Sequence, residues 1–126
     1  MTDTINPTAD QIRSLAALDR SGPVQMVNLL RFKPDGRDHY NRYADEIAPI
    51  LADIGARVVS AGDAELQVIG DGERPWWHAV LVVEYPSLDA FLGMLRREDY
   101  GPVHEHRERA LERAELIATR PWQAVQ

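Results

Sequence analysis

Two segments of this chain are apolar on both faces of an extended backbone, and this restricts the fold more than any other feature. Val24–Phe32 (VQMVNLLRF) and Trp77–Tyr85 (WHAVLVVEY) have the residue types of buried β-strands. In the second segment Val80 and Val82 alternate with residues that are also apolar. An antiparallel sheet with one solvated face would show a clean alternation instead. We therefore expect both faces of the sheet to be covered.

Two helices follow from periodicity and capping residues. Thr8–Gln11 (TADQ) has the form of a capping box and begins a short amphipathic helix over residues 8–19. Apolar residues recur every three or four positions from Tyr40 to Ile54, which predicts a long helix with a bend at Pro49. Gly55 is suited to a left-handed C-terminal cap.

The remaining elements are predicted from turn residues and apolar runs. Residues 56–69 are interpreted as one long strand with a bulge or kink at Gly62, followed by a loop over 70–75. Ser87 is the predicted N-cap of the next helix, and Gly101–Pro102 starts another, whose apolar face we extend to Ala114. A strand over residues 116–122 completes the domain.

This order of elements indicates an α+β domain with a ferredoxin-like split βαβ antiparallel sheet. We expect a helical extension over residues 1–22 and the sheet domain over residues 23–126. Helices can cover only one face of such a sheet, so a second copy is the simplest cover for the other, and the pair would form a dimeric α/β barrel. A parallel sheet with helices on both sides is the alternative, but no helix separates the strands that flank residues 70–72.

Composition narrows the function classes. The chain has 14 basic and 20 acidic side chains, a formal charge of -6 and a pI of about 5.1, which argues against nucleic acid or an anionic membrane as partner. The absence of cysteine excludes disulfides, thiolate nucleophiles and cysteine-based metal sites. No apolar run is long enough for a transmembrane helix, and no secretory signal is visible, so we expect a cytoplasmic protein.

Four motifs together resemble one family. They are VNLLRF, the Tyr40-x-x-Tyr43 helix, EYPSLDAF and DYGPVHEHRERAL. In combination they are similar to the DUF1330 proteins of the dimeric α/β-barrel superfamily. The resemblance implies the fold and dimerisation but carries no established activity. Relatives on the same fold include cofactor-free monooxygenases, haem-degrading monooxygenases, chlorite dismutase-like enzymes and muconolactone isomerases, and fold analogy alone does not choose among them.

The first apolar strand contains two polar residues. Asn28 shares a face with apolar neighbours, where an unpaired amide would cost about 1–3 kcal/mol, so either a ligand or a backbone group or water must satisfy it. Arg31 points to the opposite face near the strand end. It is a candidate for gripping a carboxylate or carbonyl, with pairing to Glu84 or an acidic partner-chain residue as the structural alternative.

The helix after Gly101 supplies further candidates. Steps of three and four from Val103 place His106 and Arg107 on its inward face. His106 is the candidate acid or base, since histidine titrates near neutral pH, and a hydrogen-bonded core histidine is the alternative. Arg107 is a candidate for anchoring a carbonyl or carboxylate group of the ligand. Three phenols complete the predicted ligand-binding set, although a phenol on an apolar stripe most often belongs to the core: Tyr40, Tyr43 and Tyr85.

A metal or haem site has weak support in the sequence. His104 and His106 lie about 200° apart round an ideal helix and cannot chelate one ion from it. Compared with the haem-degrading relatives, Asn28 and His104 match, but Met94 occupies the position of the tryptophan that distorts the porphyrin. We therefore expect no metal and no cofactor. Three hypotheses stay open: a cofactor-free enzyme of monooxygenase or isomerase type, a non-catalytic dimeric ligand-binding or sensing module, and, with the least support, haem or metal handling of the haem-degrading monooxygenase type.

Overall fold

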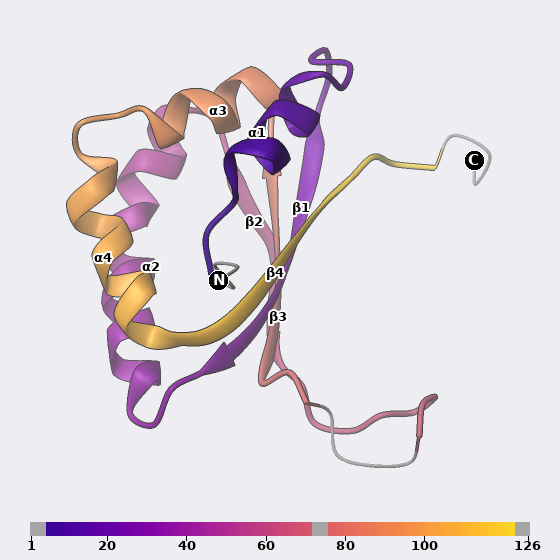
Figure 1. Ribbon diagram of the computed structural model, residues 1–126, viewed down its shortest axis with the longest axis vertical. Helices are drawn as coiled ribbons and strands as arrows, with labels where there is room; N and C mark the ends of the chain where they lie inside the picture. The colour runs from indigo at the N-terminus through magenta and orange to yellow at the C-terminus, as the bar shows by residue number, and fades with distance from the viewer. Residues whose placement is uncertain (1–4, 72–75, 123–126) are drawn as a thin grey trace.

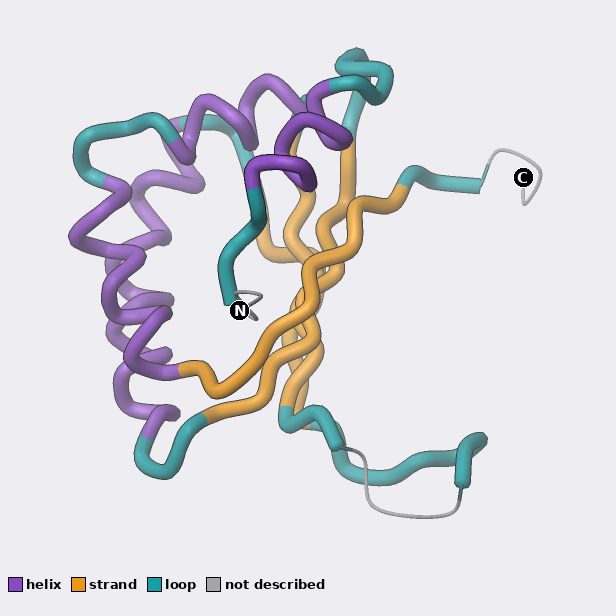
Figure 2. The backbone as a smooth tube through the Cα atoms, viewed as in Figure 1, coloured by secondary structure: helices purple, strands orange, loops and turns teal. Residues whose placement is uncertain are grey.

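The fold agrees with the predicted class. A computed structural model describes residues 5–71 and 76–122 of the chain. The strands lie in the order β2-β3-β1-β4 and each neighbouring pair is antiparallel, which is the ferredoxin-like arrangement. Figures 1 and 2 show the helices of the described chain on one side of this sheet. The elements are α1 (Ala9–Ala16), β1 (Val24–Phe32), α2 (Gly36–Asp53), β2 (Arg57–Asp63), β3 (Ala79–Tyr85), α3 (Leu88–Leu95), α4 (Tyr100–Ala110) and β4 (Leu111–Thr119).

The local signals at the helix ends act as the sequence predicts. Thr8 and Gln11 form both hydrogen bonds of the capping box, at 3.1 Å and 2.9 Å. The hydroxyl of Ser87 accepts a hydrogen bond of 3.1 Å from the backbone N–H of Ala90. Gly55 adopts φ 78° directly after Ile54, the C-cap of α2, where a residue with a Cβ would be strained.

The prediction of a strand over residues 64–69 is wrong. The ladder between β2 and β3 ends at the pair Asp63 and Ala79, and one further hydrogen bond of 2.9 Å joins the N–H of Ala64 to the carbonyl oxygen of His78. Residues 65–69 pair with no strand of the described chain. Val68 and Ile69 are 88% and 94% exposed. The irregularity in β2 falls between Val58 and Ser60 and not at the predicted glycine. Residues 70 and 71 of the predicted loop are outside regular structure, and residues 72–75 lie outside the described part of the chain.

The predicted boundary between the last helix and the last strand is also wrong. Helix α4 ends at Ala110, and β4 begins at Leu111, five residues before the predicted start. The charged repeat of this segment has helical periodicity, but Leu111 pairs with Phe32 and the ladder continues to Gln25 and Thr119. Pairing with the central strand therefore overrides local helix propensity.

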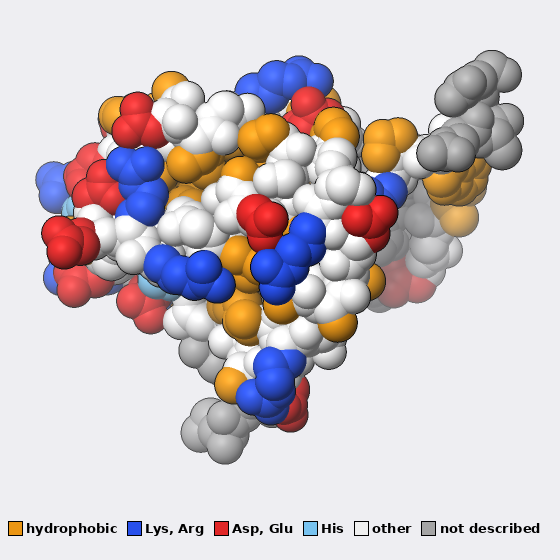
Figure 3. Space-filling model, turned by 90° about the horizontal axis from the view of Figure 1, so that it is seen from above, with side chains coloured by type: hydrophobic (Ala, Val, Ile, Leu, Met, Phe, Trp, Pro, Cys, Tyr) orange, Lys and Arg blue, Asp and Glu red, His pale blue; other side chains and the backbone are white. Residues whose placement is uncertain are grey.

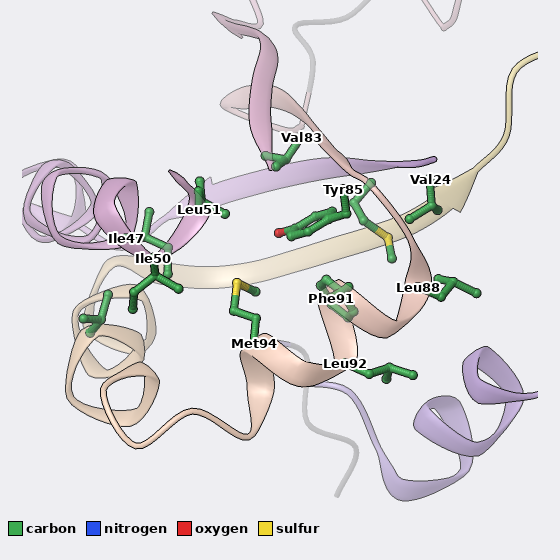
Figure 4. Packing of buried hydrophobic residues seen from close by; sticks show 12 residues of the cluster. Val24, Ile47, Ile50, Leu51, Val83, Tyr85, Leu88, Phe91, Leu92 and Met94 are labelled. Carbon is green, nitrogen blue, oxygen red and sulfur yellow. The ribbon is translucent and has the colours of Figure 1, made fainter. Parts of the chain in front are cut away.

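The main core lies between the helices and the inner face of the sheet. Val24 and Met26 of β1 are each 1% exposed. Figure 4 shows Val24 on the side of the sheet that faces α3. In the same core the ring of Tyr85 from β3 meets the ring of Phe91 from α3 edge to face, with centroids 5.1 Å apart. Ile12 and other apolar residues of α1 pack against the same core. The N-terminal helix is therefore in contact with the helix layer through the side that the sequence predicted to be apolar.

The outer face of the sheet is also apolar. The register aligns Val27 with Val82 and Ile117, and Leu29 with Val80. These five residues, which we call the outer patch, point away from the helices because their neighbours in each strand point towards them. No helix of the described chain covers this side (Figure 1). The double-sided apolar pattern of the sequence therefore corresponds to one face under helices and one face without them.

Within residues 5–71 and 76–122, no helix has both the length and the hydrophobicity needed to cross a bilayer. Seen from the end where α1 and α3 lie, acidic and basic side chains are interspersed (Figure 3). That view therefore has no extended basic patch of the kind that nucleic acids require.

One glycine is required by a close backbone approach. A Cβ built on Gly36 at the start of α2 would lie 2.1 Å from the carbonyl oxygen of Ala110 at the end of α4. The same oxygen accepts a hydrogen bond of 2.9 Å from the backbone N–H of Lys33. The turn between β1 and α2 therefore packs against the C-terminal end of α4 so closely that no side chain fits at residue 36.

We expect Gly36→Ala to reduce the free energy of unfolding by about 1–3 kcal/mol, because the added methyl group must displace backbone atoms. Urea denaturation monitored by circular dichroism measures the change. Gly93→Ala in α3 is the matched control, since a Cβ there meets nothing within 4 Å. The control should raise stability by up to about 1 kcal/mol through helix propensity. Equal effects of the two substitutions would contradict the close approach.

Candidate functional site

A cavity of about 740 Å³ lies between the helix layer and the inner face of the sheet. This volume is within the range of small-molecule sites. Its walls come from all four strands, from helices including α2 and α4, and from the segment that precedes α1. Most of the lining is apolar. The polar side chains of the lining include Asn6, Asn28, Tyr40, Tyr43, Tyr85, Tyr100, His104 and Arg107.

Arg107 brings a positive charge to this cavity. Its residue is only 8% exposed, and its guanidinium donates a hydrogen bond of 2.8 Å to the carbonyl oxygen of Ile5. Within the described residues no carboxylate lies in ion-pair range of Arg107. A buried cation without a counter-ion is unfavourable unless something else compensates its charge. The position of Arg107 therefore favours an anion in the cavity.

All four tyrosines of the chain line the cavity. Burial raises the pKa of each phenol above its ordinary value of 10.0, while the charge of Arg107 acts in the opposite direction. The hydroxyls of Tyr40, Tyr43 and Tyr85 have no hydrogen-bond partner among the described residues. Figure 4 shows the hydroxyl of Tyr85 directed away from Val24, towards the side of α2. The cavity wall therefore carries neutral O–H groups that are available to a ligand.

Asn28 offers the cavity a hydrogen-bond acceptor, whereas the tyrosines offer donors. Its amide nitrogen lies 3.4 Å from the carbonyl oxygen of Met26 and 3.3 Å from that of Leu81. Since both neighbours are acceptors, the nitrogen must be the end that faces them, and the oxygen Oδ1 faces elsewhere. Backbone groups thus satisfy the donor side of the amide, as one of the two sequence alternatives anticipated. Oδ1 has no partner within the described chain and is the group that a ligand donor would meet.

Two residues that the sequence reasoning did not select complete the wall. The hydroxyl of Tyr100 lies 3.1 Å from Nδ1 of His104, and the two rings stack with centroids 5.2 Å apart. Nε2 of His104 lies 2.5 Å from Oδ1 of Asn6. The spacing of Tyr100, His104 and Arg107 at i, i+4 and i+7 places all three on one side of a helix. That spacing was the available signal, but steps of three from Val103 favoured His106 instead.

The structure places two predicted site residues outside the cavity lining. Nε2 of His106 lies 3.0 Å from a carboxylate oxygen of Glu46 on α2, and its Nδ1 is buried without a partner in the described chain. Arg31 is on the outer side of the sheet, where it pairs with Glu112 at 3.3 Å and lies over the ring of Trp76. The predicted alternative partner of Arg31, Glu84, is paired with Arg57.

The other five predicted ligand-binding residues all contribute to the cavity wall: Asn28, Tyr40, Tyr43, Tyr85 and Arg107. They come from β1, α2, β3 and α4, so only the folded arrangement brings them together. Met94, which occupies the position of the haem-degrading relatives' tryptophan, is 2% exposed and lies in the same lining. In the part of the chain that is described, no group of three or more histidine, aspartate or glutamate side chains is placed to hold a metal ion.

Comparison with known proteins establishes the family. The model of a domain of unknown function, DUF1330, matches residues 29–120. The chain belongs to the DUF1330 family. A search of curated proteins finds none that matches this DUF1330 chain.

Solved structures support the fold of this DUF1330 protein. A Rhodopseudomonas palustris protein of unknown function is 35% identical, with a TM-score of 0.85 over 97% of this chain and 99% of that one. Its methylated form is 34% identical, with a TM-score of 0.87 over the whole of both chains.

More distant structures share the fold alone. A Bacteroides fragilis protein, described as dimeric with a ferredoxin-like fold and unknown function, is 17% identical, with a TM-score of 0.56 over 82% of this chain and all of that one. A Caulobacter crescentus protein described as a candidate antibiotic biosynthesis monooxygenase is 13% identical, with a TM-score of 0.59 over 82% of this chain and 92% of that one.

We expect the tyrosines of this DUF1330 protein to resist ionisation while it is folded. Their pKa values are raised by burial, so the neutral phenols contribute stability that is fully present below about pH 10. That contribution is lost as the pH rises from the unfolded pKa through the folded values. Phenolate absorbance followed during alkaline titration measures this. Because the cluster contains every tyrosine, normal titration near pH 10 in the folded state would contradict the burial of the wall.

Proposed function

We propose that this DUF1330 protein binds a small organic ligand bearing a carboxylate or a carbonyl group in the cavity between sheet and helices. The observation that carries this proposal is the buried guanidinium of Arg107, which has no carboxylate partner within the described residues. A ligand carboxylate would accept charge-assisted hydrogen bonds from it, in the bidentate geometry that arginine favours. The ligand would thereby compensate a charge that the fold leaves unpaired.

The remaining wall supports the same ligand class. The hydroxyls of Tyr40, Tyr43 and Tyr85 are donors that suit carbonyl or carboxylate oxygens. Oδ1 of Asn28 is an acceptor that suits a hydroxyl or enol at another point of the ligand. Between them the lining is apolar, with Leu30 and Phe91 among its members, and suits a hydrocarbon or aromatic body. This combination of an apolar cavity and a few convergent polar groups is typical of small-molecule sites.

We expect Arg107→Gln to weaken binding of benzoate and phenylpyruvate at least tenfold, since a charge-assisted hydrogen bond contributes about 1.5–3 kcal/mol. Isothermal titration calorimetry measures the affinities, and benzamide serves as the uncharged analogue that the substitution should affect less. Arg109→Gln is the matched control, because Arg109 is on the same helix and exposed. Unchanged affinity in the Arg107 variant, or no binding of any acid at millimolar concentration to the unaltered protein, would contradict the proposal.

Two activities are compatible with such a site. One is catalysis without a cofactor, of monooxygenase or isomerase type, and the Caulobacter crescentus neighbour's description is consistent with it. At that level of identity the likeness supports the fold and not the reaction. The other is a binding or sensing role without catalysis. The hydrogen-bonded pair of Tyr100 and His104 in the wall supports the catalytic hypothesis, because a phenol and an imidazole in hydrogen-bond contact are able to pass a proton between them.

We further propose that the protein is a homodimer through the outer patch defined above. Ile117 and Val80 in this patch are 46% and 37% exposed, and no helix of the described chain covers them. A second sheet is the cover that fits a flat apolar face of this kind. The description of the Bacteroides fragilis neighbour as dimeric supports this assembly for the fold.

We expect Ile117→Glu to convert the dimer into monomers, because two carboxylates would be buried where the sheets meet. Sedimentation velocity at micromolar concentration measures the mass. Leu18→Glu is a suitable control, since Leu18 is similarly exposed, at 51%, but lies outside the sheet. The proposed interface is contradicted if the unaltered protein sediments as a monomer, or if both variants stay dimeric.

A further inference from the structure

A continuous chain of hydrogen bonds leads from the surface of α4 into the cavity. Glu108 accepts from the amide nitrogen of Asn6 at 3.1 Å, and Oδ1 of Asn6 lies 2.5 Å from Nε2 of His104. Nδ1 of His104 then lies 3.1 Å from the hydroxyl of Tyr100. Asn6, His104 and Tyr100 all belong to the cavity lining. Among the described residues, the other phenols of the cavity have no such hydrogen-bond partner.

For a neutral His104, the partners in the described chain set the direction of each of these hydrogen bonds. An ionised glutamate only accepts, so Asn6 donates to Glu108 with its NH₂ group and must present its oxygen to His104. Nε2 of His104 therefore carries the proton, and Nδ1 holds the lone pair. It follows that the hydroxyl of Tyr100 donates to Nδ1. The phenol oxygen of Tyr100 keeps its lone pairs for the cavity, with a proton acceptor directly behind it.

We propose that Tyr100 is the acid–base catalyst of the cavity and that His104 and Asn6 are its positioning residues, for keto–enol tautomerisation of an enolisable 2-oxo acid. This inference rests on the proposed function, because it requires a bound organic acid. It assigns the histidine of the site to His104, which faces the cavity, and not to His106, which faces α2. The arrangement follows the general logic of a reacting group, a base and an orienting group.

The proposed step balances without any further reactant. The bond between hydrogen and the carbon beside the carbonyl breaks, and its electron pair moves to the carbonyl oxygen. Tyr100 takes this proton on its phenol oxygen as its own hydroxyl proton passes to Nδ1 of His104. The products are an enolate and an imidazolium, with Tyr100 neutral throughout. Return of the proton to the oxygen gives the enol, and the reverse sequence gives the ketone.

The cavity wall suits the charge that develops in this step. The carboxylate of the acid would lie on Arg107, and the enolate oxygen would accept from the unpaired phenols of Tyr40, Tyr43 or Tyr85. A phenol is already neutral at physiological pH, and burial raises the pKa of these three further, so they remain able to donate. Fixed donors aimed at a developing oxyanion are the usual means by which enzymes stabilise an enolate. The enol hydroxyl, once formed, would meet Oδ1 of Asn28.

The first test needs no ligand. Heteronuclear NMR of the imidazole nitrogens in the purified protein should show His104 protonated on Nε2 and not on Nδ1. Tyr100→Phe should shift the Nδ1 resonance of His104 and leave that of His106 unchanged. An Nδ1–H tautomer for His104 would overturn the relay, as would an Nδ1 signal that does not respond to the loss of the Tyr100 hydroxyl.

The second test uses phenylpyruvate, whose keto and enol forms differ in ultraviolet absorbance. The unaltered protein should accelerate their interconversion. Tyr100→Phe and His104→Gln should each lower kcat about 100-fold, with KM changed by no more than about twofold, as expected for loss of acid–base catalysis. Glu105→Gln, an exposed position on the same helix, is the matched control and should match the unaltered protein.

The outcomes separate this inference from the proposal on which it depends. If calorimetry shows that phenylpyruvate binds but the protein does not accelerate tautomerisation, the inference is overturned and the binding function stands. Turnover that survives Tyr100→Phe, or that is lost on His106→Gln and kept on His104→Gln, also overturns it. Absence of binding by phenylpyruvate and benzoate alike overturns the proposed function itself.

Discussion

The positive charge of Arg107 is the constraint around which the rest of the cavity is arranged. It projects from the buried side of α4, is fixed by the carbonyl oxygen of Ile5 and has no carboxylate partner in the described chain. A folded protein tolerates such a charge when hydrogen-bond acceptors or a bound anion compensate it. The four tyrosines lie close enough for the charge of Arg107 to act on their pKa values, and none of them supplies a negative group at neutral pH.

The distribution of donors and acceptors connects this charge to a function. The guanidinium of Arg107 and the unpaired phenols are hydrogen-bond donors in the cavity, whereas Asn28 contributes an acceptor. The Tyr100–His104 pair adds a group that is able to give or take a proton. These features together describe a site for an anionic, oxygen-bearing molecule that changes its protonation state. The ferredoxin-like fold alone supports no such conclusion, because the same fold carries unrelated functions.

The agreement between sequence and structure depends on how local each signal is. Strand β1 and the caps at Thr8 and Ser87 were predictable because neighbouring residues determine them. The predicted strand over residues 64–69 does not form, because those residues lie beyond the ladder between β2 and β3. The early start of β4 at Leu111 follows from pairing with β1, which no local pattern encodes. The site shows the same division. Asn28 was identified by its polarity in an apolar strand, whereas the choice between His104 and His106 depends on how α4 is rotated against the sheet.

A crystal structure with bound 4-bromobenzoate is the sharpest test of an anion site at Arg107. The anomalous signal of bromine locates the ring independently of the protein coordinates. We expect the ring to lie between the helices and the sheet, with the carboxylate in contact with the guanidinium of Arg107 and at least one phenol hydroxyl. A carboxylate bound only at the outer surface, with the Arg107 guanidinium paired to a group of the protein itself, would contradict it.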